Sequence, residues 1–425
     1  MTRPVGATMV AVGIVALEFS IAVSTFVSST LLPTVAGDLH AHGHLGLLLA
    51  GSILGLFVAL PLASRLLRGI GTARTLTFGL LGYVVGALAA ATSRTAVVFA
   101  VGQFVGGFAS GLLAVFGISS VIKYLDYDLR VRVVAASSAM WILPAMVGPA
   151  ATLALEHAFG WRWTLLAPMP IVLVGRLLVA RAVRGGDSDD ARSRPLLRTL
   201  LVPVGVAALV LAGGHASWWP IAVAGVAVAV VGVGTIMPPG TIRLARGVPA
   251  ALGALTLYAV GYFGADSLIT VLLTDSYHAS LARAAIVLSA APLAWAVTSL
   301  LLPRIVRDRR SPPASVGLAL GACGVLALSL TLLVSTSFAA ALIAWTVGGI
   351  GIGLAYPSMY LICTSTDRAG GLDATELATA VITAEAFGGL LGRATGGAVI
   401  AAGPIVTYAL FAAFLFAAAV AVRRS

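Results

Sequence analysis

Charged residues, lysine and cysteine are scarce in this chain of 425 residues. Only 10% of the residues are charged, whereas 60% are hydrophobic and the mean hydropathy is +1.05. A soluble domain carries about 25% charged residues, because its surface has to be hydrated. The composition therefore excludes a soluble protein and predicts a polytopic membrane protein.

The two cysteines and the histidines give little sign of metal or cofactor chemistry. Cys323 and Cys363 lie in or beside apolar runs without metal-ligand spacing, which excludes a disulfide framework and a zinc site. His40, His42 and His44 alternate in a way that can bind a transition metal. Because their loop is short, exposed and without supporting partners, we expect no metal site. The chain also lacks a nucleotide-binding loop, so we expect no ATP and no other cofactor.

Apolar runs of about 17 to 28 residues recur along the whole chain, bounded by Arg, Pro, Gly or Asp. They predict an all-α integral membrane protein with fourteen spanning helices. The expected spans cover roughly residues 8–32, 44–67, 73–92, 96–121, 131–155, 163–182, 196–213, 217–237, 248–273, 281–303, 314–334, 338–362, 374–401 and 404–422.

The basic residues are distributed unevenly between the loops of this arrangement. One set of loops collects only Arg94, Arg162 and Arg283, whereas the termini and the opposite loops collect most of the other basic residues. Positively charged loops stay in the cytoplasm, so both termini are expected there, in a bacterial inner membrane. The net charge of +11 is spread over many short loops, which favours the lipid bilayer over nucleic acid as a partner. We expect a monomer.

A polar segment and an internal repeat divide the chain. Residues 185–195 (GGDSDDARSRP) read as a linker. We predict one six-helix bundle over residues 1–183, a linker with an inserted helix pair over 184–247, and a second six-helix bundle over 248–425. A shift of 242 residues matches Pro61 with Pro303, Arg65 with Arg307, Arg68 with Arg310, Gly79 with Gly321, Gly82 with Gly324, Gly106 with Gly348, Gly107 with Gly349 and Gly111 with Gly353.

An aspartate in the middle of an apolar span makes residues 256–275 (TLYAVGYFGADSLITVLLTD) the first functional candidate. A carboxylate at that depth almost always faces a bundle interior or a water-filled path. Helical spacing places Tyr262 and Tyr258 on the same face as Asp266. Under the 242-residue shift, Ser24 matches Asp266. The first helix of each six-helix bundle is therefore expected to line a shared cavity. The matched stripes are Ser20, Ser24 and Ser28 against Tyr262, Asp266 and Thr270.

Three motifs resemble those of the major facilitator superfamily, specifically its fourteen-helix drug:proton antiporter branch. Gly148 and Pro149 resemble the Gly-Pro of the antiporter motif, and residues 160–170 (GWRWTLLAPMP) resemble the segment that follows it. Residues 31–39 (LLPTVAGDL) look like the end of the first helix of such exporters. The resemblance implies a secondary transporter driven by a proton gradient, with two halves that rock about a central cavity.

Other family motifs are altered in this chain. In the loop after the second span, Ser64 stands where the family has an aspartate, although Arg65 is kept. In the fourth span Gln103 fits the pattern, but Ala100 replaces its arginine. The resemblance also places Asp126 near Arg65 and Arg68, which implies an ion pair at an inner gate. A solvated loop charge is the alternative.

Few titratable residues lie deep in a predicted span. Glu18, Asp266 and Glu385 are the acids, and Arg393 is expected to be the only basic residue in mid-span. Glu385 and Arg393 are eight residues apart, about 12 Å of helical rise, so Arg393 needs a carboxylate from another helix, either Asp266 or Glu18. Each acid either carries the transported proton or fixes helix packing. Asp266 is the first choice as the carrier.

The remaining candidates would line a substrate cavity. Aromatic and polar side chains in five spans favour an apolar pocket with a few polar groups, although interfacial anchoring or ordinary packing is the alternative for each. The set is Ser24, Thr25, Ser28, Gln103, Trp141, Met146, Tyr258, Tyr262, Trp345, Tyr356 and, on the same helix as the last two, Tyr360.

These patterns favour a proton-coupled exporter of hydrophobic or amphipathic small molecules. A facilitator or a lipid or metabolite exporter without proton coupling is the first alternative, favoured by the altered fourth span. A membrane-embedded transferase is the second, and it would need an acid/base or nucleophile cluster at a membrane face. The short loops supply no such cluster, so we do not expect an enzyme.

Overall fold

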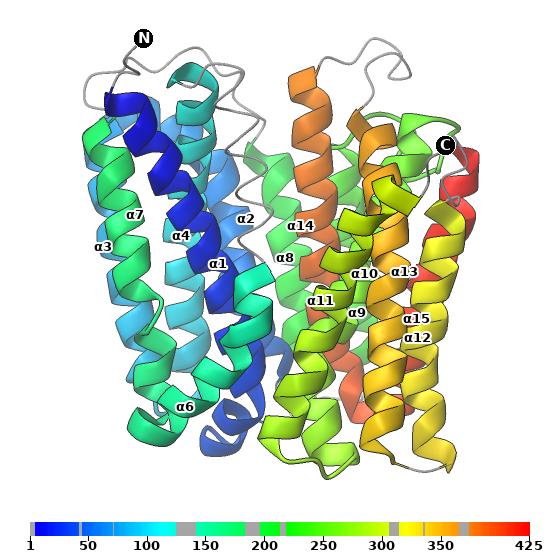
Figure 1. Cartoon of the computed structure of the whole chain (residues 1–425). Coiled ribbons are helices and arrows are strands. Elements are labelled where there is room, and N and C mark those ends of the chain that lie inside the picture. The colour runs from blue at the N-terminus through cyan, green and yellow to red at the C-terminus, as the bar shows by residue number, and fades with distance from the viewer. Residues whose placement is uncertain are drawn as a thin grey trace. The chain divides into compact units, whose positions relative to one another are not determined.

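A computed structural model describes residues 5–41, 45–70, 72–124, 142–182, 196–212, 218–305, 314–334, 336–364 and 374–425. Every regular element within these ranges is a helix (Figure 1), which confirms the all-α prediction for them. The long helices are α1 (Val5–Asp38), α2 (Leu45–Ile70), α3 (Thr72–Ala91), α4 (Ala96–Tyr124), α6 (Ile142–Leu166), α7 (Met169–Ala182), α8 (Leu196–Ala212), α9 (Trp219–Gly234), α10 (Val248–Val271), α11 (Leu281–Ile305), α12 (Ala314–Val334), α13 (Phe338–Thr364), α14 (Ala374–Val399) and α15 (Pro404–Ala421).

Helical structure is what such apolar sequences require, because a helix satisfies its own backbone hydrogen bonds where lipid cannot. Among the described residues, six stretches are long and apolar enough to cross a membrane. The number of fourteen spans remains a prediction. The six are Leu143–Leu178, Val248–Ser276, Leu281–Leu301, Ala314–Val334, Phe338–Cys363 and Pro404–Arg424.

The interval predicted between spans 131–155 and 163–182 contains a break in the helix. Helix α6 continues to Leu166 and α7 begins at Met169. The regular helix is interrupted at Gly160, which has φ 77° and ψ 164°. Only glycine adopts such a positive φ without strain, so the kink falls inside the GWRW segment.

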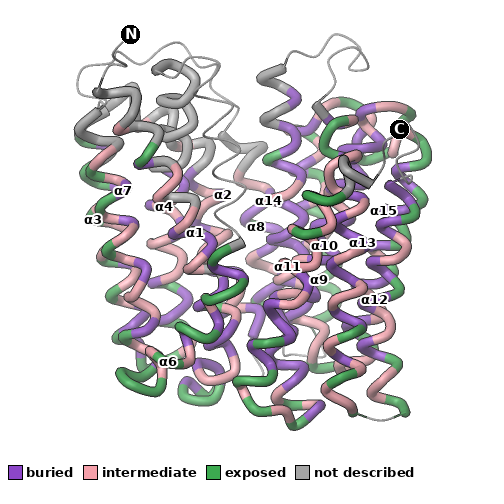
Figure 2. Tube along the Cα trace, viewed as in Figure 1, coloured by how far each residue is buried: buried purple, intermediate pink, exposed green. Residues whose placement is uncertain are grey.

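The contacts group the chain into an N-terminal unit (residues 1–42 and 50–203) and a C-terminal unit (43–49 and 204–425). In the N-terminal unit, α1 packs on α6 and α7, and α3 packs on α4. In the C-terminal unit, α10 packs on α14 and α15, α12 packs on α13 and α15, and α11 packs on α13. Figure 2 shows α10 as a largely buried helix.

The inserted helices α8 and α9 approach one another at glycines. A Cβ added to Gly225 on α9 would lie 2.9 Å from the Leu209 nitrogen on α8, and its nearest neighbour is the Gly205 carbonyl. Leu209 and Val226 line an apolar groove that Val399 of α14 completes. The contacts thus place α9, and α8 from Val204 onward, with the C-terminal helices. The predicted domain bounds are left untested by this grouping.

Helix α10 has well-defined ends. It begins after Gly247, which has φ 89°, and has proline in its first turn, where a missing N–H costs nothing. After Val271 it widens into a π-helix, η3 (Leu272–Ser276). Burial raises the pKa of the Tyr277 phenol just beyond it. This phenol donates a 2.8 Å hydrogen bond to the Leu328 carbonyl and contacts Thr331 Oγ1, which ties the end of α10 to α12.

The internal repeat is present in the packing, but not with one constant offset. In the N-terminal unit a Cβ on Gly86 would lie 2.7 Å from the Gly102 oxygen and 2.8 Å from the Gly106 Cα. In the C-terminal unit a Cβ on Gly324 would lie at the same distances from the Ala344 oxygen and the Gly348 Cα. Gly324 therefore corresponds to Gly86. The 242-residue shift had matched it with Gly82, and that match was wrong.

The same comparison shows which residues of α2 and α11 occupy equivalent positions in the repeat. Gly107 meets the Ser52 carbonyl where Gly349 meets that of Ala291, and Gly111 meets Leu56 where Gly353 meets Trp295. Helices α4 and α13 thus keep the 242-residue separation seen from Gly106 to Gly348. Helices α2 and α11 are 239 residues apart, as from Ser52 to Ala291, and α3 and α12 are 238 apart, as from Gly86 to Gly324. Because these shifts differ by about one helical turn, the match of Ser24 with Asp266 remains a prediction.

Candidate functional site: a carboxylate and an aromatic cluster on α10

Asp266 lies in the second half of α10, with Tyr262 and Tyr258 one and two turns before it. Both tyrosines are buried, at 2% and 0% exposure. The Asp266 side chain is half-buried as a whole, but its Oδ1 is buried and has no hydrogen-bond partner. An unpaired buried carboxylate oxygen is costly, so this position has more than a packing role.

Four further aromatic side chains surround the two tyrosines, and we call the six together the aromatic cluster: Tyr258, Tyr262, Phe263, Trp295, Trp345 and Tyr356. Tyr262 stacks on Trp345 of α13 with ring centroids 5.7 Å apart and an interplanar angle of 1°. Tyr258 stacks on the same Tyr262 at 5.9 Å and 16°. Trp295 of α11 meets Tyr262 edge-on at 5.7 Å and 89°.

Glycines allow the helices around Asp266 to approach α10 closely. A Cβ on Gly388 of α14 would lie 2.6 Å from the Ala259 Cβ, and one on Gly392 would lie 3.0 Å from Val260 backbone atoms. On the α15 side, a Cβ on Gly261 would lie 2.7 Å from the Phe411 oxygen. Small residues at such crossings are the usual means of close helix packing in membranes. They bring the charged residues of α14 within reach of α10.

Arg393 of α14 is the cation of this site. Its guanidinium lies 5.8 Å from the centroid of the Phe263 ring, and it interacts electrostatically with Asp266. Asp266 is one of the two carboxylates from another helix that the sequence offered for Arg393. Glu18, the other candidate, lies on α1, and its side chain is outside the described residues.

Glu385 occupies a different part of α14. It lies within side-chain hydrogen-bonding reach of the Tyr356 hydroxyl on α13. Tyr360 and Cys363, further along α13, also interact with it electrostatically. The two acids of the C-terminal unit thus face different partners, Asp266 with an arginine and Glu385 with tyrosines.

Tyr408 on α15 touches the site from a side that the sequence did not indicate. Its hydroxyl, fully buried, donates a 3.0 Å hydrogen bond to the carbonyl oxygen of Ala265, the residue before Asp266. Its ring packs edge-on against Phe411 at 6.0 Å, and a Cβ on Gly264 would lie 2.8 Å from Cζ of that phenylalanine ring, with Cε1 nearer still. Tyr408 is therefore positioned to hold the backbone of α10 at Asp266.

We expect Tyr408→Phe to lower the stability of the purified protein by about 1 kcal/mol, because one net hydrogen bond is lost while the ring packing remains. Thermal unfolding in detergent measures the change. A loss of several kcal/mol would contradict this account and would give the hydroxyl partners beyond the Ala265 carbonyl.

The predicted site residues of the N-terminal unit do not form a cluster comparable to the one around Asp266 among the described residues. Ser20 donates a 2.7 Å hydrogen bond to the Ala16 carbonyl within its own helix, Ser24 is half-buried and Ser28 is exposed. Gln103 on α4 is half-buried, and Met146 on α6 is 60% exposed. Their role in a cavity remains a prediction. The side chains of Thr25, Arg65 and Arg68 and the residues Trp141 and Asp126 lie outside the described residues, as do His42 and His44.

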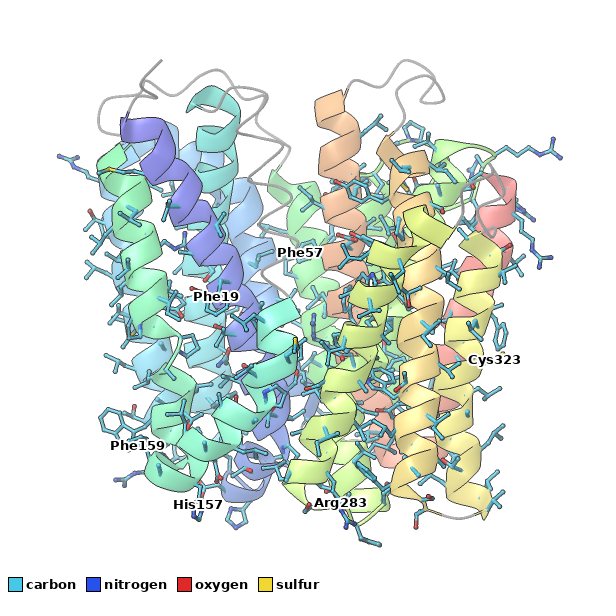
Figure 3. The ribbon with its side chains drawn as sticks, viewed as in Figure 1. Phe19, Phe57, His157, Phe159, Arg283 and Cys323 are labelled. Carbon is cyan, nitrogen blue, oxygen red and sulfur yellow. The ribbon has the colours of Figure 1, made fainter. Side chains whose placement is uncertain are left out.

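The antiporter-like motifs do meet in this unit. A Cβ on Gly148 would lie 3.3 Å from the Phe26 Cβ of α1, and Pro149 is buried inside α6. At the end of α6, Arg162 Nη1 lies 2.9 Å from Asp38 Oδ2 and Trp161 Nε1 donates to the same oxygen at 3.1 Å. The GWRW and LLPTVAGDL segments thus bind one another. Figure 3 shows His157 and Phe159 projecting from this end of α6.

A second basic residue of the described helices is half-buried. Arg176 lies on α7, near the end of the candidate span Leu143–Leu178, so it does not contradict the prediction that Arg393 is the only basic residue in mid-span. Arg176 Nε is buried without a hydrogen-bond partner and interacts electrostatically with Tyr83 of α3. The expected span 163–182 likewise places Arg176 near its cytoplasmic end.

Comparisons with known proteins agree on the fold. A family model described as Major Facilitator Superfamily matches residues 14–381. The multidrug efflux pump SdrM of Staphylococcus aureus is 22% identical over 170 residues, 40% of this chain and 38% of that protein. A "probable multidrug-efflux transporter" of Mycobacterium tuberculosis is 26% identical over 204 residues, 48% of this chain and 43% of that protein. The chain thus matches less than half the length of these relatives.

Two solved structures share the fold along almost the whole chain. A D-xylose-proton symporter has a TM-score of 0.63 at 14% identity and covers 98% of this chain and 96% of its own. An auto-inhibited peptide transporter of the POT family has a TM-score of 0.67 at 16% identity, with 99% and 96% covered. At such identities the likeness concerns the fold and not the substrate.

Proposed function

We propose that this chain, which belongs to the major facilitator superfamily, exports hydrophobic or amphipathic small molecules in exchange for protons. Membership makes it a multi-pass membrane transporter rather than an enzyme. The efflux function of the two distant relatives supports export. The observation that carries the proposal is Asp266 Oδ1, buried and unpartnered beside an aromatic cluster.

The chemistry of the site fits an exchange of proton and substrate. A carboxylate in an apolar setting has to be neutralised by a proton or by a nearby cation. Asp266 has access to both, because Arg393 interacts with it across the α10–α14 contact. When the proton leaves, the carboxylate is free to attract Arg393 or to accept a hydrogen bond from a substrate. Loss of the proton and binding of substrate are thereby linked.

The remaining features of the proposed transporter are those predicted from the sequence. They are a fourteen-helix monomer of the drug:proton antiporter branch in a bacterial inner membrane, with both termini cytoplasmic and no cofactor. Two six-helix halves would alternate access to the substrate. Glu385 and Glu18 are further candidates for proton carriers.

The test is gradient-driven transport by the purified protein in proteoliposomes. With a pH gradient imposed, an antiporter accumulates substrate against its concentration gradient and dissipates the pH gradient when substrate is added. A facilitator of the same fold, the alternative favoured by Ala100 in place of the family's arginine, only equilibrates the substrate. Equilibration without proton flux would overturn the proton-coupled proposal.

A further inference from the structure

Four polar atoms in and beside the aromatic cluster are buried and lack a hydrogen-bond partner among the described residues. They are the Tyr258 and Tyr262 hydroxyls, Trp345 Nε1 and Asp266 Oδ1. Nearly all buried polar groups in proteins are hydrogen-bonded, and a buried donor without a partner is destabilising. Four such atoms at one place indicate a site whose partners come from a ligand.

In the aromatic cluster the faces of the stacked rings contact one another, whereas the polar atoms at the edges of those rings have no partner within the described part of the chain. Tyr258, Tyr262 and Trp345 form one stack, with interplanar angles of 16° and 1° between neighbours, so that their facing surfaces cover one another. A cation bound by these aromatic rings would need an open ring face. What remains unpartnered is the polar edge of each ring. The stack of Tyr258, Tyr262 and Trp345 is thus suited to bind a ligand through hydrogen bonds, whereas the Phe263 ring already has the Arg393 guanidinium over it.

The identity of each polar atom limits the ligand. An indole N–H can only donate, so Trp345 requires an acceptor such as a carbonyl oxygen. A tyrosine hydroxyl can donate or accept, and a carboxylate oxygen requires a donor such as a ligand hydroxyl. Asp266 already has Arg393 as a countercharge, so the ligand does not have to supply one.

The accessible side of the cluster is aromatic as well. Trp295 and Tyr356 are only half-buried. Their rings meet at 5.2 Å and 64°, and Trp295 covers Tyr262 edge-on. A ligand that enters past these two rings gains most if it is itself flat and aromatic.

We propose that the aromatic cluster binds an uncharged aromatic compound bearing both a carbonyl and a hydroxyl group, with Trp345 Nε1 donating to the carbonyl oxygen. This inference rests on the proposed function, because it names the substrate class of the same site. It assigns Trp345 the role of distinguishing a carbonyl-bearing ring from the plain hydrocarbon.

The test compares two flat ligands, 1-hydroxyanthraquinone and anthracene, by equilibrium binding to the full chain in nanodiscs, with empty nanodiscs subtracted. Trp345→Phe keeps an aromatic ring and removes the N–H. We expect it to weaken binding of 1-hydroxyanthraquinone about fivefold or more, the usual effect of one lost hydrogen bond, and to change anthracene binding less than twofold. Tyr262→Phe should likewise weaken binding of 1-hydroxyanthraquinone more than binding of anthracene.

Trp219→Phe on α9 is the matched control, because this side chain is 67% exposed, and it should affect neither ligand. Equal losses for both ligands in Trp345→Phe, or no loss in either variant, would overturn the inference. So would wild-type protein that binds tetraphenylphosphonium while 1-hydroxyanthraquinone fails to displace it. Because binding is measured without a proton gradient, selective binding without transport would contradict the proposed export and leave this assignment standing.

Discussion

Asp266→Asn is expected to abolish proton-driven transport while the protein still binds its substrate. The amide has nearly the shape of the carboxyl group, but it cannot take up or release a proton and offers Arg393 no charge. The aromatic cluster remains in place, because its ring contacts do not involve Asp266. The variant should therefore lose accumulation against a gradient in proteoliposomes and keep binding within a few-fold of wild type.

The controls are the other two acids. Glu385→Gln removes a charge that faces Tyr356 rather than Arg393, and Glu18→Gln alters α1. Both should transport at a reduced rate or normally, but not fail as Asp266→Asn does. If Asp266→Asn accumulates substrate at the wild-type rate while Glu18→Gln does not, the coupling site lies on α1 and its assignment to α10 is wrong.

Gly107→Ala is expected to have the largest effect on stability. A Cβ at this position in α4 would overlap the backbone of Ser52 in α2, with its carbonyl oxygen nearest and its Cα 2.7 Å away. Backbone atoms cannot rotate aside, so the two helices have to separate. We expect a loss of about 3 kcal/mol, at the upper end of the usual range for overpacking, or a failure to accumulate folded protein.

The neighbouring residue provides the control. A Cβ at Gly106 would meet nothing within 4 Å, and alanine favours a helix over glycine by about 1 kcal/mol. Gly106→Ala should therefore be neutral or stabilising. Thermal unfolding of both variants in the same detergent measures the difference, and equal stability of the two would contradict the close packing of α4 on α2.

Much of the fold could be predicted because lipid imposes a simple rule. An apolar run that crosses the bilayer has to be helical, so composition alone indicated the class, and the predicted bounds of α11 and α13 lie within two residues of the observed ones. The gap between the predicted spans 131–155 and 163–182 contains Gly160, but its positive φ could not be predicted from the pattern. Nor could the contacts that follow the kink, in which Trp161 and Arg162 bind Asp38, 123 residues before Trp161.

The candidate site likewise contains residues that the sequence indicated and residues that it did not. Asp266 and the tyrosines beside it were visible, because an acid in an apolar run is rare and helical spacing fixes which residues share its face. Trp295, Phe263 and Tyr408 were missed. Trp295 is the single aromatic residue of its apolar run, Phe263 does not share the four-residue spacing of Asp266 and the two tyrosines, and Tyr408 lies in a run with several other aromatic residues. The lone tryptophan in mid-span on α11 was the one signal that could have drawn attention. Only packing shows that Tyr408 reaches the carbonyl before Asp266.

The repeat shows a limit of alignment by a single offset. Matching glycines suggested 242 residues throughout, yet equivalent contacts require 239 for α2 and α11 and 238 for α3 and α12. Glycine is frequent here, with 48 copies, and it recurs at helical spacing, so a wrong register one turn away also matches several glycines. The contacts discriminate between registers because each glycine has to meet a particular backbone.

The central claim is that substrate and a proton compete for Asp266, and the proton released on binding tests it most directly. Substrate identified by transport is added to the purified protein in a weakly buffered detergent solution at a mildly acidic pH, where Asp266 holds its proton before substrate binds, and a pH indicator reports the released protons. The account predicts a release approaching one proton per bound substrate for the wild type and none for Asp266→Asn. Saturating binding to the wild type without proton release, or equal release by both proteins, would contradict it.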